Sequence, residues 1–333
     1  STKSICFLSC YQKYKGKKYN RTLIYFHKSL ANHSLLNDIR RLMRSKSKLG
    51  TLLFSIFMGC NSIMEYNPME IKLSEEFSIK EAEYSSLAWS GQQLLLLPQF
   101  PNRFSGHMGG NILSISKHRI DSYISGKIDQ PIEPNKIGFN DDGLSKTIPG
   151  FEGFEAIVVH GDSVYLTIEA KEREGRFGYI VFGKADWEKQ EIHLDHSSLK
   201  RIQSNLFMSQ MSFETLLMRD DSLIAIYEAN GRKITNIPQA AVFDKALNQL
   251  DNIPIPSIEY RLTDATSISQ EGVFWAINYF YPEEETLKPD IDPIAESFGR
   301  GKTHAKENTV ERLLQLSFQN GSVILGPKAP VQL

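Results

Sequence analysis

Two pairs of glutamates with the same spacing are the residues in this sequence best suited to acid–base or metal chemistry. Glu155 and Glu169 stand second and last in FEAIVVHGDSVYLTIE, and Glu214 and Glu228 stand second and last in FETLLMRDDSLIAIYE. Carboxyl groups that lie close together can act as general acids and bases or bind hard cations. The shared spacing of 14 positions predicts that one repeated structural unit places both pairs.

Two further segments follow the same pattern with other polar residues at the two positions. Ser85 and Gln99 occupy them in SSLAWSGQQLLLLPQ, and Asp264 and Asn278 occupy them in DATSISQEGVFWAIN. Each copy has two short apolar runs around a polar turn, which is typical of a β-hairpin. Weaker apolar runs follow every hairpin, so a unit of about four short strands recurs along the chain.

This repeat predicts an all-β fold, a β-propeller of four-stranded antiparallel blades. Four blades can be recognised in the sequence. We expect five or six in the complete protein because the sequence ends without a closing element. A β-sandwich or a large barrel would not require the repeat, and no long segment keeps a helical period. The segment 67–79 is interpreted as a lone strand that precedes the first blade and closes the ring.

In a propeller the first strand of each blade lines the central tunnel, and its start lies at the same rim as the end of the second strand. The two positions of each copy are therefore expected to be neighbours. Carboxylates that converge on one axis would repel each other, and a calcium ion, which accepts oxygen ligands in irregular geometry, would relieve the repulsion. The predicted ligands are Ser85, Glu155, Glu214 and Asp264. Alternatively, these side chains pair with Lys or Arg or bond to backbone amides of the next blade, and any ion serves stability alone.

The segment FEGFEAI at 151–157 and the acidic blade openings resemble the bacterial "esterase-like activity of phytase" group of propellers. The same features resemble the calcium-activated nucleotidase, or apyrase, propellers. The resemblance covers about residues 80–333 and implies hydrolysis of phosphoric or related esters with calcium in the tunnel.

Basic residues in the loops that share this rim are candidates to bind a small anionic substrate. Arg103, Lys171 and Arg232 follow the second strands, and His304 lies in the long segment 281–308. Long loops in compact folds are commonly functional. The alternative is that these residues are ordinary solvated surface charges.

The leading hypothesis is a calcium-dependent phosphoester hydrolase in which Glu169 and Glu228 orient water or act as base and His304 meets the anionic group. The first alternative is a binding or scaffold propeller without catalysis. A second alternative is a six-bladed lactonase or esterase. The sequence contains no P-loop, dinucleotide fingerprint or serine-hydrolase motif, and its net charge of −1 gives no reason to expect a nucleic-acid partner.

The segment 43–60 has the three parts of an export signal, with a basic start, a short apolar run and then Gly59 and Cys60. Its end resembles the lipobox of bacterial lipoproteins, so Cys60 is predicted to carry a lipid anchor in the cell envelope. On this interpretation residues 1–42 are an upstream basic segment outside the mature protein, and residues 61–333 form the propeller. A short buried helix with an incidental cysteine is the alternative.

Overall fold

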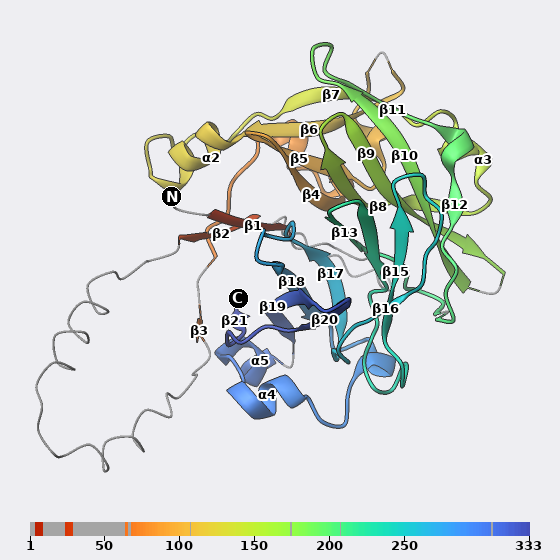
Figure 1. Cartoon of the computed structure of the whole chain (residues 1–333). Coiled ribbons are helices and arrows are strands. Elements are labelled where there is room, and N and C mark those ends of the chain that lie inside the picture. The colour runs from red at the N-terminus through yellow and green to blue at the C-terminus, as the bar shows by residue number, and fades with distance from the viewer. Residues whose placement is uncertain are drawn as a thin grey trace, which may run out of the picture.

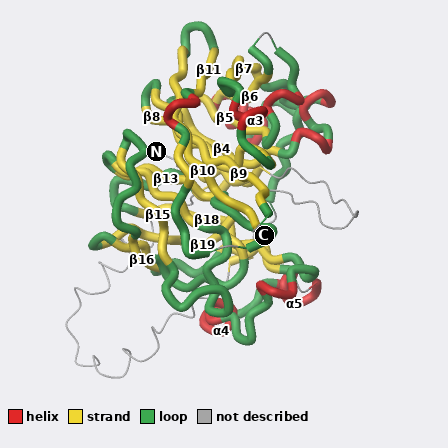
Figure 2. Tube along the Cα trace, turned by 90° about the vertical axis from the view of Figure 1, so that its right-hand side faces the viewer, coloured by secondary structure: helices red, strands yellow, loops and turns green. Residues whose placement is uncertain are grey.

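The computed structural model describes residues 4–8, 24–28, 64–65 and 68–333, apart from positions 107, 174, 207 and 308 (Figure 1). The predicted export signal at 43–60, with Cys60, lies outside the described residues. Strands form the body of the molecule, and Figure 2 places the short helices α4 (Pro293–Phe298) and α5 (Lys302–Glu307) together at one end of it. None of the helices within the described ranges has the length and apolar character needed to cross a bilayer.

The first two repeats each form a four-stranded antiparallel unit. Blade 1 consists of β4 (Tyr84–Ser90), β5 (Gln93–Pro98), β6 (Gly110–Ser116) and β7 (Asn135–Asn140). Blade 2 consists of β8 (Phe151–His160), β9 (Ser163–Glu172), β10 (Gly175–Asp186) and β11 (Glu191–Leu194), with β12 (Lys200–Arg201) paired to β10.

The last two repeats have the same order. Blade 3 consists of β13 (Thr215–Arg219), β14 (Ser222–Ile226), β15 (Gln239–Asp244) and β16 (Ile253–Pro254). Blade 4 consists of β17 (Arg261–Ala265), β18 (Val273–Phe280) and β19 (Val310–Gln319), and β19 then pairs with both β20 (Ser322–Leu325) and β21 (Val331–Gln332).

The first strands of the blades are neighbours in the order β4, β8, β13, β17. The short strand β1 (Ser4–Leu8), which pairs with β2 (Ile24–Lys28), contacts both β4 and β17. This arrangement of first strands and of four-stranded antiparallel units confirms the predicted β-propeller fold. A total of five or six blades stays a prediction.

Apolar side chains on alternating strand positions fill the space between neighbouring blades, as a period of two requires. Leu95, Phe154 and Leu166 belong to one buried cluster between blades 1 and 2. A second cluster joins blades 2 and 3, and a third joins blades 3 and 4. Three of the predicted hairpin turns contain a glycine with positive φ, at Gly91, Gly161 and Gly272, which is the backbone conformation that such turns demand.

Blades 1 and 2 are joined by an additional pairing that the repeat does not predict. Their outermost strands, β7 and β11, pair in parallel, so the two blades form one continuous sheet. Blades 3 and 4 belong to separate sheets. The propeller is therefore not built from four equivalent blades.

The prediction of a lone strand at 67–79 is wrong. This segment contains the 3-10 helix η1 (Glu75–Phe77), and a second 3-10 helix, η2 (Lys80–Ala82), follows it. Leu73 makes a single bridge to Ile132 at blade 1. Leu73 and Phe77 both pack into the apolar cluster on that blade. The strand that pairs with the end of the chain is β3 (Met64–Glu65), which lies parallel to β21.

The remaining short helices cap or connect blades at their edges. Ser116 accepts a hydrogen bond from the backbone N–H of Arg119 at the start of one of them, and Asp141 accepts such bonds at the start of another. They are α2 (Lys117–Ile124), α3 (Leu144–Thr147), η3 (Pro101–Arg103), η4 (His196–Ser198) and η5 (Glu285–Leu287).

Candidate functional site

The repeated polar positions are structurally equivalent in all four blades. In each blade, the second-strand position bonds or pairs with a residue that lies two places before the first-strand position. These partners are Glu83 with Gln99, Gly153 with Glu169, Ser212 with Glu228, and Leu262 with Asn278. The spacing found in the sequence therefore corresponds to a repeated geometry.

In three of the blades the first-strand position coincides with a β-bulge. The ladder shifts register around Ser85, around Glu155 and around Asp264. A bulge leaves a residue outside the regular pairing and re-aims its side chain, and bulges are over-represented beside active sites. The chain thus departs from ideal strand geometry at the positions whose polar side chains repeat.

Four glutamates from blades 2 and 3 form one buried group, which we call the axial carboxylate cluster. Its members are 0–3% exposed, and the charges of the other three all act on Glu155. They are Glu155, Glu169, Glu214 and Glu228. This arrangement is consistent with the sequence-based expectation. Each pair of glutamates was expected to be close together and close to the other pair.

Arg261 of β17 reaches from blade 4 to the cluster. Its Nε donates to Glu228 Oε2 at 2.5 Å, and its Nη2 donates to Glu214 Oε1 at 3.0 Å. Its Nη1 donates to Glu284 Oε1 at 2.9 Å. Burial alone would lower the pKa of Arg261, but these glutamates hold it well above its ordinary value. The protein therefore supplies one of the positive charges that converging carboxylates need.

The other end of the cluster is closed by Arg176 and Gln99. Arg176 Nε donates to Glu152 Oε2 at 2.5 Å and lies 3.2 Å from Glu169 Oε1. Gln99 Nε2 donates to Glu155 Oε1 at 2.9 Å. The Arg176 and Glu152 side chains are 19% and 27% exposed, so solvent meets the cluster from this side.

Carboxyl groups outnumber guanidinium groups in this network. Among the described residues, six glutamates, counting Glu152 and Glu284 at its ends, share the guanidinium groups of Arg176 and Arg261. A buried excess of negative charge is expensive, so it is removed by protons or by an added cation. The cluster therefore holds protons near neutral pH unless a cation enters.

The pKa values of the cluster have the direction that this charge balance requires. Burial raises the pKa of Glu169 to about 8, although Arg176 opposes the rise. Burial, followed by the charge of Glu169, raises the pKa of Glu155 well above its usual range. The second oxygen of Glu169, Oε2, is buried and has no hydrogen-bond partner among the described residues. A protonated Glu169 could therefore donate a proton from Oε2.

Asp264, the fourth-blade position, connects blade 4 to blade 1. Its carboxylate accepts from the Ser86 hydroxyl and the Leu87 N–H, both at 3.4 Å, and from the Ala265 N–H at 2.9 Å. Burial raises the pKa of Asp264 to about 8. This arrangement matches the alternative in which an acidic position bonds to groups of the next blade.

Three of the four predicted calcium ligands, Glu155, Glu214 and Asp264, bond to other protein groups among the described residues. Within that part of the chain, no group of three or more His, Cys, Asp or Glu side chains is arranged to hold a metal ion. Glu214 bonds Arg261, and Asp264 bonds blade 1. Calcium binding at Ser85, Glu155, Glu214 and Asp264 stays a prediction.

The three predicted anion-binding residues have different surroundings. Arg103 donates to Glu83 Oε2 at 2.5 Å and stacks 4.4 Å from the centre of the Phe100 ring. Lys171 and Arg232 are exposed, on blade 2 and after blade 3. No interaction among the described residues brings these three side chains together into one anion site.

His304 is buried in a different place, a polar pocket at the long loop of blade 4. The ring of Tyr260 stands edge-on to its imidazole, with centroids 6.4 Å apart. The same pocket is lined by Arg300. His304 is thus not in contact with the axial carboxylate cluster in any interaction of the described residues.

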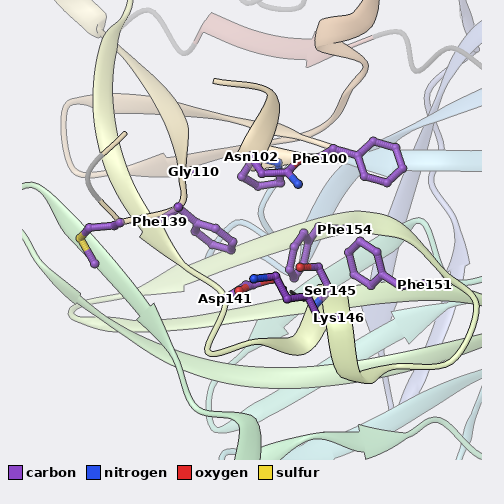
Figure 3. Close-up of a pocket in the computed structure, with 12 residues that line it drawn as sticks. Phe100, Asn102, Gly110, Phe139, Asp141, Ser145, Lys146, Phe151 and Phe154 are labelled. Atoms are coloured by element: carbon purple, nitrogen blue, oxygen red, sulfur yellow. Dashed lines mark hydrogen bonds between the residues drawn. The ribbon is translucent and has the colours of Figure 1, made fainter. Parts of the chain in front are cut away.

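A second pocket, of about 280 Å³, opens between blades 1 and 2 at the rim where β8 begins (Figure 3). Phe100, Phe151, Phe154 and Phe139 form a continuous wall in which neighbouring ring centroids are 5.2–6.2 Å apart. Asn102, Asp141, Ser145 and Lys146 add polar groups at its edge. An apolar hollow with a few polar groups is the usual form of a small-molecule site.

This aromatic pocket and the axial carboxylate cluster share the same stretches of strand. Phe154 lines the pocket, and the next residue is Glu155. The backbone N–H of Phe154 donates to the Gln99 carbonyl at 3.0 Å, and Gln99 also holds Glu155. A ligand in the pocket would therefore lie beside the strand that carries the cluster.

No family model matches the chain, and no curated protein matches its sequence. The resemblance to the esterase-like phytase and nucleotidase groups therefore stays a prediction. Comparison with solved structures finds an endo-1,4-beta-xylanase from Bacteroides thetaiotaomicron at 10% identity and a TM-score of 0.43, covering 81% of this chain and 86% of that one.

Two further structures are an alpha-L-arabinanase mutant from Cellvibrio cellulosa and a mutant GH32 beta-fructofuranosidase from Bombyx mori in complex with sucrose. Both are 10% identical with a TM-score of 0.39, covering 71% and 75% of this chain and 70% and 50% of theirs. The chain spans half the length of the fructofuranosidase. At TM-scores below 0.5 these likenesses are too distant to assign a shared fold or function.

Sequence reasoning found the glutamates but not the groups that balance them. Arg261 stands three residues before Asp264 and belongs to no repeated position. The aromatic pocket was also missed, although FEGF at 151–154 and QFPN at 99–102 contain three of its four phenylalanines. A search for aromatic residues beside the repeated positions would have indicated it.

Proposed function

We propose that this chain is a hydrolase that cleaves a neutral glycosidic bond by acid–base catalysis, with Glu169 as the acid. The observation that carries the proposal is the buried Glu169 carboxyl, whose pKa is raised to about 8 and whose Oε2 has no partner among the described residues. A carboxyl group that keeps its proton at neutral pH can protonate a leaving group.

Glycoside hydrolysis needs two carboxyl groups in opposite protonation states. Protonated Glu169 gives its proton to the glycosidic oxygen as the bond from that oxygen to the sugar carbon breaks. Burial raises the pKa of Glu228 well above its usual range, but the charge of Arg261, which bonds both Glu214 and Glu228, favours one ionised carboxylate in that pair. This carboxylate removes a proton from the water that attacks the sugar carbon, and the products are a sugar and an alcohol.

The charge of the site favours a neutral substrate over a phosphoester. Carboxyl groups are in excess, and both guanidinium groups of the network are already bonded to glutamates. The phenylalanine wall of the adjacent pocket, with half-buried Phe100 and Phe151, offers apolar ring faces for the CH groups of a sugar. An anion placed here would be repelled.

A substrate reaches Glu169 only when the side chains above it move. Glu169 is 2% exposed, while the Arg176 and Glu152 pair next to it is partly exposed. Displacement of that pair would uncover Glu169 without opening the interior of a blade. Arg176 thus covers the acid in the absence of substrate.

The test is turnover by the purified full chain on nitrophenyl glycosides of several sugars, with nitrophenyl phosphate, ATP, phytate and a lactone as comparison substrates. We expect glycoside turnover that falls about 100-fold or more in Glu169→Gln, because general acid catalysis contributes at least that factor. Glu172→Gln on the same strand is the matched control and keeps its rate. Equal rates in both variants would remove Glu169 from the mechanism.

The narrower prediction of a calcium-dependent phosphoester hydrolase has one observation in its favour, the excess of carboxyl groups over guanidinium groups. A divalent cation would balance that excess. Turnover of a phosphoester that a chelator abolishes would support it over the glycosidase proposal. No turnover of any substrate would support a binding or scaffold propeller, which the near-complete burial of the cluster also fits.

Export and lipid anchoring at Cys60 are a separate proposal that rests on the sequence of residues 43–60. Expression of the full chain in a bacterium with labelled palmitate tests it. Label in the protein that Cys60→Ser abolishes is the expected result, and unlabelled protein in the cytosol would contradict it.

A further inference from the structure

The polar pocket at blade 4 has a volume of about 230 Å³ and lies outside the network proposed for catalysis. It is enclosed by Tyr260, by Phe280 at the end of β18, and by the loop and short helices that precede β19. The rings of Tyr260 and Phe280 pack together with centroids 4.8 Å apart, which gives the pocket a fixed apolar wall.

His304 is the buried polar group of this pocket. It is 6% exposed, and its Nδ1 is buried without a hydrogen-bond partner among the described residues. Burial, followed by the charge of Arg312, lowers the pKa of His304, so the imidazole is neutral at pH 7. A buried polar atom without a partner costs free energy, and a ligand that bonds it would recover that cost.

Two cations lie at the mouth of the pocket without a recorded side-chain partner among the described residues. Arg300 and Lys288 are both exposed and line the pocket. The charge of Arg300 acts on both His304 and Tyr260, which places its guanidinium near the two rings. These cations are available to a ligand, in contrast to the guanidinium groups of the axial carboxylate cluster.

Most of the acidic groups of the pocket are already neutralised. Asp292 accepts two bonds from Arg312, at 2.9 and 3.1 Å, and also caps α4. Asp290 is 2.8 Å from Lys233 Nζ. Glu296 is the remaining acidic side chain at the pocket, so its single charge faces the two cations Arg300 and Lys288.

We propose that this pocket binds a small oxyanion, a carboxylate or phosphate group, held by the guanidinium of Arg300 and the imidazole of His304. Arginine binds planar or tetrahedral oxyanions through charge-assisted hydrogen bonds. Histidine gains a proton readily when an anion arrives. The groups that face His304 are Arg312, Asp292, Arg300 and Tyr260, and only Arg300 among the two arginines is exposed and able to move toward a ligand.

The experiment is calorimetric titration of the purified full chain at low salt with sodium phosphate and, in a separate arm, with sodium glucuronate. Glucose serves as the uncharged counterpart of glucuronate. The His304 imidazole is followed by NMR in the same titrations. We expect saturable binding of at least one anion, no binding of glucose, and a His304 signal that moves toward that of the protonated ring.

The variants separate the pocket from general surface charge. Arg300→Gln is expected to lower the affinity for the anion about tenfold or more, because a charge-assisted hydrogen bond is lost. Lys306→Gln, an exposed residue of α5 that does not line the pocket, should leave affinity unchanged. His304→Gln provides a second test because it removes the titrating ring.

Equal affinity in Arg300→Gln and Lys306→Gln would overturn the proposal, as would the absence of binding of both anions up to about 20 mM, which is weaker than a built site provides. Saturation by phosphate alone identifies a phosphate site, and saturation by glucuronate alone identifies a carboxylate site. The measurement is binding, so it stands whether or not the chain hydrolyses glycosides.

Discussion

The axial carboxylate cluster and the His304 pocket lie in the same propeller and differ in how their charges are balanced. The four glutamates of the cluster, which are almost fully buried, share two guanidinium groups with Glu152 and Glu284 at its ends. In the pocket, the buried acid Asp292 has its own arginine, and two further cations are exposed. The first region has an excess of carboxyl groups, and the second has positive charge without a side-chain partner in the part of the chain that the structure describes.

The two regions also differ in origin. The cluster is assembled from positions that recur in successive blades, and three of the four first-strand positions coincide with a bulge. The pocket is built mainly by one segment of blade 4, between β18 and β19, which closes over Tyr260 and Phe280 of the same blade. A repeat can therefore place groups from distant parts of the chain on one axis, while an individual site needs only one elaborated loop.

The largest expected effect is that of removing the charge of Arg261. Arg261→Met should destabilise the folded protein by about 3–5 kcal/mol, because it leaves buried carboxylates without their cation. The free energy of unfolding, measured by urea titration at pH 7, checks this. Arg201→Met is the control, since Arg201 is exposed and stacks on Phe177 at 3.7 Å.

A loss in Arg261→Met no larger than that of the control would mean that the cluster is already neutral by protonation. Repeating the urea titration at pH 5 distinguishes a cluster that is ionised at pH 7 from one that is already protonated. If the cluster is ionised at pH 7, extra protons on its glutamates at pH 5 should reduce the loss of unfolding free energy that Arg261→Met causes. This would sharpen the contrast with the His304 pocket.

The second effect is a loss of stability as the pH rises. Glu169 and Asp264 have pKa values of about 8 in the folded protein, above those of the unfolded chain. Between about pH 5 and 8 the folded state keeps protons that the unfolded state has lost, so unfolding becomes easier by up to about 1.4 kcal/mol per pH unit for each group. The stability is therefore greatest near pH 5 and declines toward pH 8.

Urea midpoints between pH 5 and pH 9 measure this slope. Glu169→Gln and Asp264→Asn each replace a titrating acid by a neutral amide, so each should flatten the profile and raise stability at pH 8. A slope that is the same in both variants and in the unmodified chain would show that neither acid is protonated in the folded state.

A smaller effect is expected at the phenylalanine wall. Phe151→Ala removes a half-buried ring that contacts both Phe100 and Phe154. If the pocket holds the sugar, KM for the best glycoside should rise about tenfold while kcat changes little, as for loss of uniform binding. Steady-state kinetics decide, and an unchanged KM would separate the pocket from the acid Glu169.

The smallest effect is that of the exposed pair between Lys233 and Asp290. Lys233→Met should change the free energy of unfolding by less than about 1 kcal/mol, because surface pairs contribute little. It should also weaken the binding of the oxyanion at His304 slightly, because Lys233 then no longer balances the charge of Asp290. A large loss of stability would mean that this loop is as tightly coupled to the fold as the axial carboxylate cluster.

The sequence was sufficient to predict the propeller and the convergence of the glutamates, because both depend on a repeated pattern of strands and polar positions. It did not predict Arg261, since a single arginine gains its role only when blade 4 packs against blade 3. The segment 67–79 was misread as a strand because Ile71, Leu73 and Phe77 resemble a strand pattern but pack on blade 1. The sequence indicated only that His304 lies in a long loop, and it could not show that this loop buries the imidazole.

The parallel pairing of β7 with β11 has a consequence for how the protein comes apart. Residues 84–194 are tied into a single sheet, whereas β13–β16 and β17–β21 form separate sheets that contact their neighbours through side-chain packing and the side-chain bonds of Arg261 and Asp264. Cooperative units of this kind open independently of one another. Under mild denaturant or limited protease, the first half should survive as one resistant fragment after the second half has become accessible, so the ring would open from its carboxyl-terminal side.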